Sequence, residues 1–462
     1  MGKMFSSTRR EFGKTVLGGA AALAGSASAF GRATKERPNI IFLLTDDQRW
    51  DQMSCAGHPV LRTPNMDRIA REGVMFRNMF VTTSLCSPSR ASFLTGRYVH
   101  AHGVKDNKPK TDIAEAEMRH SYPYLLREAG YQTAYVGKFH MGNHPQPHPG
   151  FDYWAALPGQ GRYIDPEFNI NGEMKVLKGY SGAVTTDLAL DFLKQRKQDK
   201  PFCLALGFKE VHDPRTPPEH LKTLYSDAKV EMPPITKDQF RGKPAAVRKR
   251  FELAGKVAGK GREENIRNYW RCVISADEQI GRVLNFLDEA KLAENTIVAF
   301  AGDNGYFMGE FGLGDKRWGY EPSLRIPMLM RYPKLIKPGT KVDEMALNID
   351  LCPTLLDLAG VSVPKRAHGS SWRPLLEGRK TKWRESFLYE YFHEDPYVPP
   401  TIRGLRTEQY KYLSYPGSTD GEELYDLKAD PHEWNNLADK PEHRSLIAKL
   451  RAEAERIETH TS

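Results

Sequence analysis

Cysteine is scarce in this sequence, and long apolar runs are missing. Five cysteines among 462 residues cannot form a disulfide-dense scaffold, so the core must form by hydrophobic burial. No stretch reaches the roughly 18 apolar residues that cross a bilayer, so we do not expect an integral membrane protein. Glycine and proline show no collagen-like or low-complexity excess. The net charge of +9 is compatible with polyanionic partners but selects none.

The N-terminus has the layout of an export signal. Arg9, Arg10 and Phe12 precede a short run of apolar and small residues, Thr15 to Ala24, and Ala27-Ser28-Ala29 supplies a cleavage site. This arrangement is typical of a secretory signal and is too short for a membrane anchor. The paired arginines favour a twin-arginine signal over an ordinary secretory one. We therefore predict a signal peptide over residues 1–29, bacterial export machinery as a partner, a periplasmic or secreted protein, and no stable membrane insertion after cleavage.

Two apolar strands end in carboxylates. The run from Asn39 to Leu44 stops at Thr45-Asp46-Asp47, and the run from Thr296 to Ala301 stops at Gly302-Asp303-Asn304-Gly305. In open parallel sheets, ligands bind beyond the carboxyl ends of the strands. Four hard oxygen ligands there suit Ca²⁺, or alternatively Mg²⁺, rather than zinc. Spacing alone leaves open that these are turn residues.

Strands and helices alternate along most of the chain. Helices are expected from Thr63-Pro64 to Gly73, near Tyr122–Ala129 and near Glu264–Ala290, with strands between them. This pattern predicts an α/β fold with a large, mostly parallel sheet between helices. After Gly360, short strand candidates (389–392, 405–413 and 424–425) precede a helix near 446–458, which predicts a smaller antiparallel α+β unit. The expected domains are residues 30–364 for catalysis and 365–462 for the C-terminal unit.

A basic segment interrupts this alternation between Lys229 and Arg262, with ten basic and three acidic residues. A solvated insertion is the favoured interpretation, and a polyanion-binding arm is the alternative.

Cys86 is expected at the N-terminus of a short helix, because Pro88 and Gly96 frame the helix ends. The helix dipole, with Arg90 one turn further on, favours an anion there and is expected to lower the pKa of the thiol. A nucleophile and a structural cysteine are both consistent with this position.

The motif Cys86-Ser87-Pro88-Ser89-Arg90 with Leu94-Thr95-Gly96-Arg97 strongly resembles that of the type I sulfatases of the alkaline-phosphatase superfamily. Further matches occur in the expected order across nearly the whole chain after the signal peptide. They are Leu44-Thr45-Asp46-Asp47-Gln48, Gly137-Lys138-Phe139-His140, Gly302-Asp303-Asn304-Gly305, Gly314-Asp315-Lys316, Glu423-Leu424-Tyr425-Asp426-Leu427 and Asp430-Pro431.

The resemblance implies a sulfuric ester hydrolase in which a maturation enzyme oxidises the cysteine to formylglycine, whose hydrate is the nucleophile. Asp46, Asp47, Asp303 and Asn304, with the converted Cys86, would hold one divalent cation, usually calcium. Arg90 would stabilise the hydrate and the transferring sulfuryl group, and Lys138 and Lys316 would grip sulfate oxygens. His140 would help to expel sulfate by deprotonating the second hydroxyl, and His212 would protonate the leaving alcohol.

The substrate is expected to be a sulfated oligosaccharide or polysaccharide, with some likeness to N-acetylglucosamine-6-sulfatases, and no nucleic-acid partner is expected. Residues suited to a sugar ring lie near these motifs, and each could equally be structural: His102, Asp106, Asn107, Trp318, Arg325, His393 and Arg403. Three alternatives stay open. They are a formylglycine-dependent phosphonate monoester or phosphodiester hydrolase, an inactive glycan-binding protein, and a phosphatase-like enzyme that uses Cys86 directly.

Overall fold

A ten-stranded mixed sheet forms the centre of the computed structural model, which describes residues 37–143, 146–257 and 260–462, without the side chains of 252–260. The strand order is β11-β2-β10-β9-β1-β8-β4-β5-β6-β7. The strands are β1 (Asn39–Thr45), β2 (Val74–Phe76), β4 (Gln132–Lys138), β5 (Tyr153–Leu157), β6 (Glu167–Ile170), β7 (Glu173–Val176), β8 (Phe202–Gly207), β9 (Thr296–Gly302), β10 (Met328–Arg331) and β11 (Thr340–Val342).

Strand β1 lies between β8 and β9 and runs parallel to both. All seven of its residues are buried, as expected of a strand covered on both faces. Ile40 packs in one hydrophobic core and Ile41 in the other, because neighbouring side chains point to opposite faces of a strand. The carboxyl ends of β1 and β9 therefore lie side by side at one edge.

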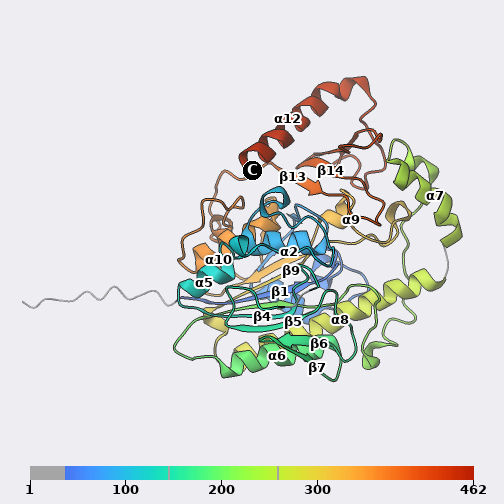
Figure 1. Ribbon diagram of the computed structural model, residues 1–462. Helices are drawn as coiled ribbons and strands as arrows, with labels where there is room; N and C mark the ends of the chain where they lie inside the picture. Colours follow the sequence, from blue (N-terminus) through green and yellow to red (C-terminus); the bar gives the residue numbers. More distant parts are fainter. Residues whose placement is uncertain (1–36, 144–145, 258–259) are drawn as a thin grey trace, which may run out of the picture. The chain divides into compact units, whose positions relative to one another are not determined.

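Helices cover both faces of this sheet (Figure 1). Helices α1 (Pro64–Glu72), α6 (Ser181–Gln195) and α8 (Lys260–Glu289) pack on one face, and α2 (Cys86–Thr95), α5 (Tyr122–Glu128) and α10 (Leu351–Leu358) on the other. The other α-helices that precede the C-terminal sheet are α3 (Val99–His102), α4 (Glu115–Met118), α7 (Ala245–Val257), α9 (Glu321–Leu324) and α11 (Arg373–Leu376). A two-stranded sheet consists of β3 (Met79–Phe80) and β12 (Ala346–Leu347).

The C-terminal region forms a separate four-stranded antiparallel sheet followed by a helix, α12 (Arg444–His460). Its strands are β13 (Ser386–Tyr391), β14 (Ile402–Thr407), β15 (Tyr410–Ser414) and β16 (Glu423–Asp426). The single strand expected over 405–413 is wrong: the chain turns between β14 and β15, where Tyr410 N donates to Thr407 Oγ1 at 2.8 Å. The predicted fold class is confirmed.

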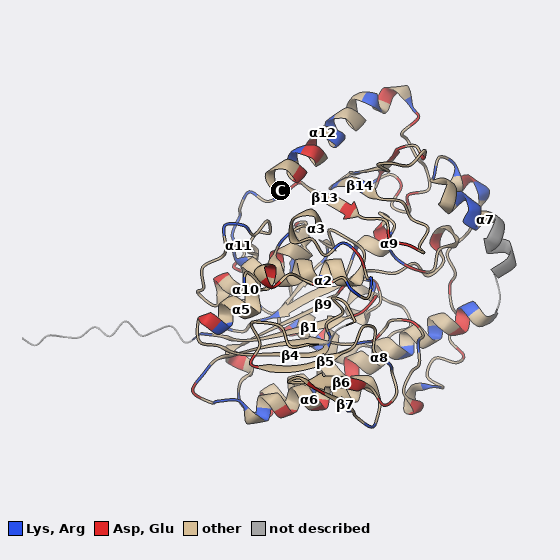
Figure 2. Cartoon of the chain, in the orientation of Figure 1, with Lys and Arg blue, Asp and Glu red and all other residues tan. Residues whose placement is uncertain are grey.

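The basic segment between Lys229 and Arg262 is only partly solvated. Phe240 and Val247 are buried against the C-terminal sheet. Lys243 is also buried, and its Nζ donates to Tyr425 Oη at 2.7 Å. In Figure 2 the ribbon of α7, which belongs to this segment, is coloured blue at its lysine and arginine positions. The segment therefore joins the C-terminal unit and still presents cationic side chains.

The predicted signal peptide, residues 1–29, lies outside the described residues. Residues Arg37–Ser462 form one compact unit, and the boundary expected after residue 364 stays a prediction. Among the described residues, no helix has the length and apolarity needed to cross a membrane.

Candidate active site

Side chains that follow β1 and β9 meet the N-terminus of α2. Ligand atoms of Asp46, Asp47, Cys86 and Asp303 all lie within 4.8 Å of one another, and all four residues are buried. Asp47 N donates to Asp303 Oδ1 at 3.0 Å, which joins the two strand ends directly. The adjacent parallel strands thus bring together residues far apart in sequence, as the strand-end pattern predicts.

Cys86 is the first residue of α2, and every residue of this helix is buried. Its Sγ donates to Asp46 Oδ1 at 3.4 Å. Burial, reinforced by the charge of Asp46, raises the pKa of the Cys86 thiol well above its ordinary value, although Lys316 and Lys138 oppose this. The expected lowering of this pKa by the helix dipole is therefore wrong, because removal from water outweighs the dipole. The thiol is a hydrogen-bond donor here, not a thiolate.

Arg90 lies one turn further along α2 and points at the same cluster. Its Nε donates to Asp303 Oδ2 at 2.9 Å, and Nη1 donates to the carbonyl of Lys138. Nη2 lies 3.5 Å from Asp46 Oδ2 and is buried with no hydrogen-bond partner among the described residues. One guanidinium donor is therefore available to an oxyanion in this site.

Asp47 is held between a lysine and an asparagine. Lys316 Nζ donates to both of its carboxylate oxygens, at 2.6 and 2.8 Å, and Asn304 Nδ2 donates to Oδ1 at 2.6 Å. Burial raises the pKa of Asp47 to about 6, with Lys316 opposing and Asp46 and Asp303 adding to the rise. Crowded carboxylates of this kind are stabilised by a cation placed among them.

Lys138, the last residue of β4, donates to both Asp46 and Gln160. Burial works to raise the pKa of Asp46, but Lys138, His212 and Arg90 lower it well below its usual range. Asp46 is therefore ionised in this site.

The two histidines face the cluster from different loops. Burial and Lys138 lower the pKa of His140 well below its ordinary value, and its Nδ1 is buried without a hydrogen-bond partner among the described residues. Burial and Lys138 also lower the pKa of His212. His212 Nε2 lies 3.9 Å from Asp47 Oδ2, and Nδ1 lies 2.6 Å from the carbonyl of Asp213. Both imidazoles are therefore neutral and suited to proton transfer.

Two residues of this site have a strained backbone. Asp47 and His140 have φ values of 58° and 55°, in the left-handed region that costs a non-glycine residue free energy. Gly137 precedes Lys138 with φ of 100°, and a Cβ there would lie 1.9 Å from the carbonyl oxygen of Gly207. Only glycine allows β4 and β8 to approach closely enough at this point.

The seven residues expected to bind sugar lie in several places. Trp318 lines a cavity of about 770 Å³ together with Lys316. Asn107 Oδ1 accepts a hydrogen bond from Ser87 N at 3.0 Å, which supports the start of α2. Arg325 stacks on Trp50 at 3.7 Å, in another cavity that contains none of the cluster residues.

The other four members of this set make local contacts. His102 is buried against Ser92, Asp106 accepts from Thr111, His393 lies near Asp395 and Pro399, and Arg403 lies over Phe392. Each of these contacts is internal to the fold.

Three polar residues near the site have no counterpart in the motifs. Gln160 accepts from Lys138, and Lys209 Nζ donates to the carbonyl of Gln160 at 3.1 Å. Lys209 closely follows β8, so the strand-end rule could have found it. Gln160 lies in a loop that no pattern connects with the site.

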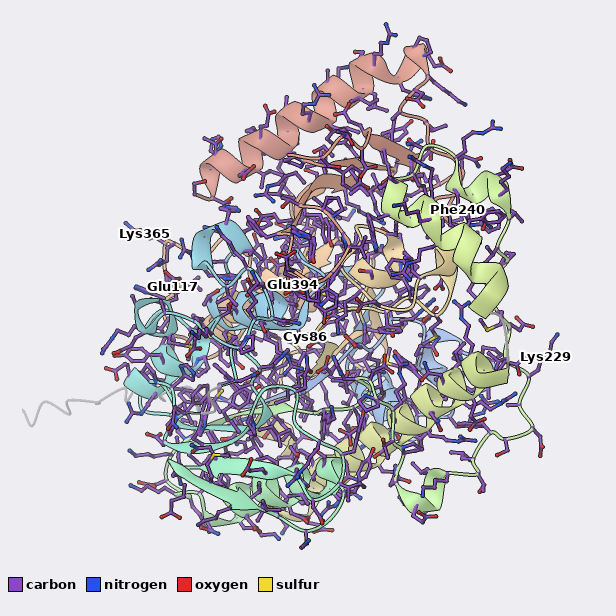
Figure 3. The ribbon with its side chains drawn as sticks, turned by 45° about the vertical axis from the view of Figure 1, so that its right-hand side comes forward. Cys86, Glu117, Lys229, Phe240, Lys365 and Glu394 are labelled. Carbon is purple, nitrogen blue, oxygen red and sulfur yellow. The ribbon has the colours of Figure 1, made fainter. Side chains whose placement is uncertain are left out.

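The third is Glu394, which comes from the C-terminal unit. Its Oε1 accepts from Arg317 Nε and Nη2 at 2.9 and 2.7 Å, and its Oε2 accepts from Asn107 N at 2.8 Å. Because Asn107 in turn contacts Ser87, Glu394 links the residue after Lys316 to the start of α2. Figure 3 labels Cys86 and Glu394, the two ends of this connection.

The cluster fits a hard divalent cation. Three buried carboxylates converge, and Asn304 Oδ1 is buried with no hydrogen-bond partner among the described residues, although its Nδ2 is paired. An amide oxygen left free beside carboxylates is the ligand type that Ca²⁺ and Mg²⁺ prefer.

Comparison with known protein families identifies relatives over most of this chain. A model described as "Sulfatase" matches residues 38–361, and one described as "N-sulphoglucosamine sulphohydrolase, C-terminal" matches residues 309–460. The chain is 36% identical to an N-acetylglucosamine-6-O-sulfatase of Bacteroides thetaiotaomicron, over 90% of this chain and 85% of that protein. It is 30% identical to the human N-acetylglucosamine-6-sulfatase, over 93% and 86%.

Solved structures show the same fold. One, described as a complex with its substrate D-glucosamine-2-N,6-O-disulfate, superposes with a TM-score of 0.84 at 33% identity, covering 92% of this chain and 98% of that one. A phosphonate monoester hydrolase of Agrobacterium radiobacter has a TM-score of 0.76 at 21% identity, covering 92% and 96%. At that identity, the second likeness concerns the fold alone.

Proposed function

Because this chain belongs to the sulfatase family, we propose that it hydrolyses the 6-O-sulfate ester of a glucosamine or N-acetylglucosamine residue in a sulfated glycan. Membership of the family, predicted from the motifs, is confirmed, and the chain is a sulfatase. The observation that carries the proposed chemistry is the buried cluster of Asp46, Asp47, Cys86 and Asp303, whose ligand atoms lie within 4.8 Å of one another. The sugar and the position of the ester are supported by the relatives at 36% and 30% identity.

We propose that Asp46, Asp47, Asp303 and Asn304 hold one divalent cation, Ca²⁺ or Mg²⁺, beside residue 86. When bound, the cation and a formylglycine made from Cys86 would supply a charge-stabilised hydroxyl nucleophile. The free Asn304 Oδ1 and the raised pKa of Asp47 support this assignment.

The remaining residues bind the sulfate group and move protons. Arg90 Nη2, Lys138 and Lys316 would donate to sulfate oxygens and stabilise the charge that develops on them. His140, with its unpartnered Nδ1, would accept a proton from the hydroxyl at position 86. His212 would donate a proton to the leaving sugar oxygen from Nε2, the ring nitrogen that faces Asp47. Without substrate this histidine is neutral, and an anionic sulfate beside it would favour its protonation.

Sulfate release tests this proposal. Mass spectrometry of the peptide containing residue 86 first establishes the aldehyde, and sulfate is then measured with N-acetylglucosamine 6-sulfate, other sulfated sugars and a phosphonate monoester. We expect release from the glucosamine 6-sulfates. No release by converted enzyme supplied with calcium, or faster hydrolysis of the phosphonate, would contradict it.

Removal of the nucleophile is the sharper test. Cys86→Ala should lower kcat/KM by at least ~10³, because the residues that remain have no group to attack sulfur. Its melting temperature should change little, since the Cys86 side chain has one weak hydrogen bond, to Asp46. Chelation of divalent cations from wild-type protein should also abolish activity, and added Ca²⁺ should restore it. Activity of Cys86→Ala above a tenth of wild type would rule out this nucleophile.

Export belongs to this proposal as well. We propose that residues 1–29 direct the protein through twin-arginine machinery to the periplasm or the exterior, after a maturation enzyme has oxidised Cys86. Fractionation of cells that express wild type and an Arg9→Lys, Arg10→Lys variant should show cytoplasmic retention of the variant. Equal export of both proteins would favour an ordinary secretory signal.

A further inference from the structure

The cavity that contains Lys316 borders the reaction centre. It has a volume of about 770 Å³ and is lined by the loop around Lys316, the loop around Tyr397 and the ends of α7 and α8. Lys316 is also bound to Asp47 at 2.6 Å. The cavity and the acidic cluster therefore share one side chain, and a ligand in the cavity would lie next to the sulfate site.

Hydrogen bonds connect this cavity to the loop that carries His212. Tyr306 Oη donates to Asp213 Oδ2 at 2.8 Å and also contacts the carbonyl of Gly314. Gly314 lines the cavity, and Asp213 follows His212, the proposed donor to the leaving oxygen. The histidine loop is thus fixed to the cavity wall.

One wall of the cavity is apolar and accessible. Tyr397 and Val398 are 43% and 58% exposed, and both line the cavity with Pro396 and Pro399. The guanidinium of Arg317 lies 3.4 Å from the ring centre of Tyr397 and holds the ring in place. An exposed, fixed aromatic ring with flanking prolines is a surface suited to the apolar face of a sugar.

Another part of the lining is cationic. Arg250 on α7 and Arg262 on α8 line the cavity, and no carboxylate among the described side chains pairs with either. The acidic residue of the lining, Asp315, is paired with Arg317 at 2.5 Å. The lining therefore has an excess of positive charge. This charge comes from Arg250 and Arg262, which belong to the basic segment between Lys229 and Arg262 (Figure 2).

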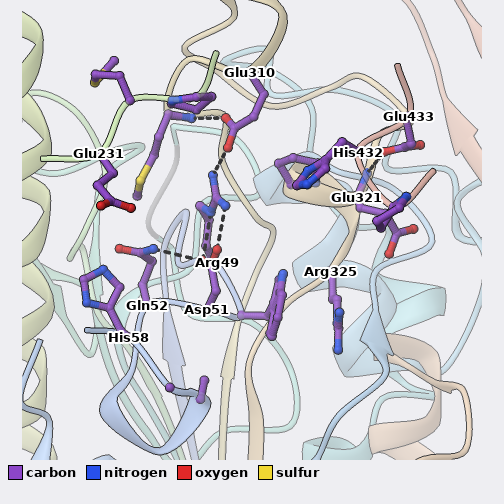
Figure 4. Close-up of a pocket in the computed structure, with 18 of the residues that line it drawn as sticks. Arg49, Asp51, Gln52, His58, Glu231, Glu310, Glu321, Arg325, His432 and Glu433 are labelled. Carbon is purple, nitrogen blue, oxygen red and sulfur yellow. Dashed lines mark hydrogen bonds and ion pairs between the residues drawn. The ribbon is translucent and has the colours of Figure 1, made fainter. Parts of the chain in front are cut away.

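The second large cavity lies apart from the reaction centre, because no residue of the acidic cluster lines it. It has a volume of about 780 Å³ and includes Arg49, which pairs with Asp51 at 2.7 Å and with Glu310 at 2.5 Å (Figure 4). Arg325, in the same cavity, lies on Trp50. Arg49 and Arg406 are thus paired with carboxylates that line the same cavity.

We propose that the cavity between Arg250, Arg262 and Tyr397 is an extension subsite that binds an anionic group, a sulfate or a carboxylate, on the sugar next to the one that loses its 6-O-sulfate. This inference rests on the proposed function and adds a second recognition element to it. Tyr397 contacts the neighbouring ring, and the two arginines bind its anionic group, since guanidinium groups pair with planar or tetrahedral oxyanions. The preferred substrate is an oligosaccharide with negative charge on adjacent sugars.

Matched disaccharides test this subsite. The substrates are 6-sulfated N-acetylglucosamine joined, at O1 or at O4, to a neutral hexose, to the corresponding uronic acid, or to the corresponding sulfated hexose. We expect wild type to prefer a charged neighbour in at least one linkage by about tenfold or more in kcat/KM, the range of hydrogen bonds to charged groups. The charged neighbour, uronic acid or sulfated hexose, that raises kcat/KM more over the neutral hexose identifies the anion that the subsite binds.

The variant Arg250→Ala, Arg262→Ala should lose this preference, chiefly through a higher KM for the charged disaccharides. Lys249→Ala is the matched control, because Lys249 is exposed beside Arg250 and does not line the cavity; it should keep the preference. Equal kcat/KM for charged and neutral neighbours in wild type, or a preference that survives in the double variant, would overturn the subsite. Failure of the proposed function would differ, because no disaccharide would then release sulfate.

Discussion

Single side chains in this site are held by more than one partner, and Arg90 shows what that achieves. Its guanidinium contacts Asp303, the carbonyl of Lys138 and, at 3.5 Å, Asp46. Nε and Nη1 fix the orientation of the guanidinium group, and Nη2 is left to bind an oxyanion. The geometry depends on a planar group with several donors, which an ammonium group cannot reproduce.

Arg90→Lys should therefore keep the charge and lose catalysis. We expect kcat/KM for sulfate release to fall by about 10² to 10³, in the range found when one donor to a developing charge is removed. Circular dichroism and metal content of the variant identify any loss that comes from misfolding. A variant that retains a third of wild-type kcat/KM with native metal content would show that charge alone is sufficient at this position.

Sequence patterns predicted much of this arrangement at the residue scale. Asp46, Asp47, Asp303 and Asn304 follow buried parallel strands, so their convergence could be derived from the strand ends. The raised pKa of Cys86 could not be derived from the sequence, because it depends on the complete burial of α2. The short helix has no apolar stripe to reveal which of its faces are covered.

At the scale of elements, the contact between β4 and β8 determines where Lys138 lies. Gly137 pairs with Gly207 in the parallel ladder, and a side chain at position 137 would collide with that backbone. The close approach lets β4 end with Lys138 pointing at Asp46. The spacing between β4 and β8 therefore determines whether the Lys138 ammonium group can pair with the Asp46 carboxylate.

Gly137→Ala should lower the melting temperature far more than Gly130→Ala. Both glycines have positive φ, 100° and 95°, but a Cβ at Gly130 would meet nothing within 4 Å. The backbone penalty of about 1–2 kcal/mol is common to both variants, and Gly137→Ala adds a clash that costs a further ~1–3 kcal/mol. Thermal unfolding of the two variants measures the difference, and equal melting temperatures would show that β4 and β8 can move apart at little cost.

Element boundaries were predictable where capping and turn residues mark them. Pro64 and Gly73 delimit α1 as expected, since proline is favoured at the first helical position. The turn between β14 and β15 has neither glycine nor proline, and it depends on the side chain of Thr407 instead. A continuous strand was the wrong inference from that pattern.

At the scale of the molecule, charged contacts join the C-terminal sheet to helix α9. Glu321, at the start of α9, contacts Lys411 of β15 at 2.9 Å and Arg406 of β14 at 3.4 Å. Burial works to raise the pKa of Glu321, but Lys411 and Arg406 lower it to about 2. The ionised carboxylate is therefore favoured in the folded protein.

This pKa predicts acid sensitivity. A glutamate with a lowered folded-state pKa stabilises the fold above its unfolded value near 4.5, and that contribution is lost as pH falls from about 4.5 to about 2. Wild type should exceed Glu321→Gln in melting temperature by on the order of 2–5 °C at pH 6, and the gap should narrow below pH 4.5. Glu408→Gln, which alters an exposed glutamate paired with Lys428, should show no such gap. A wild-type advantage that persists unchanged at low pH would refute the assignment.

The existence of a C-terminal antiparallel unit was predictable from its short strands, but its reach into the site was not. Glu394 carries no motif, and its contacts with Arg317 and Asn107 depend on how two distant loops meet. Lys243 likewise belongs to a segment whose composition favours solvent, yet it lies buried beside Tyr425. Such contacts arise from tertiary packing, which local sequence patterns do not encode.

The position of Glu394 limits how the substrate range of related enzymes can change. The loop that carries Glu394 continues directly to Tyr397, so the residue that supports the start of α2 and the aromatic ring of the proposed subsite lie on one short segment. If the C-terminal unit were exchanged between related chains, the residues at positions 394 and 397 would be replaced together. The contact with a neighbouring sugar and the support of α2 would then change at the same time. We therefore expect substrate range to change more readily through Arg250 and Arg262, because both can be replaced while Glu394 keeps its contacts with Arg317 and Asn107.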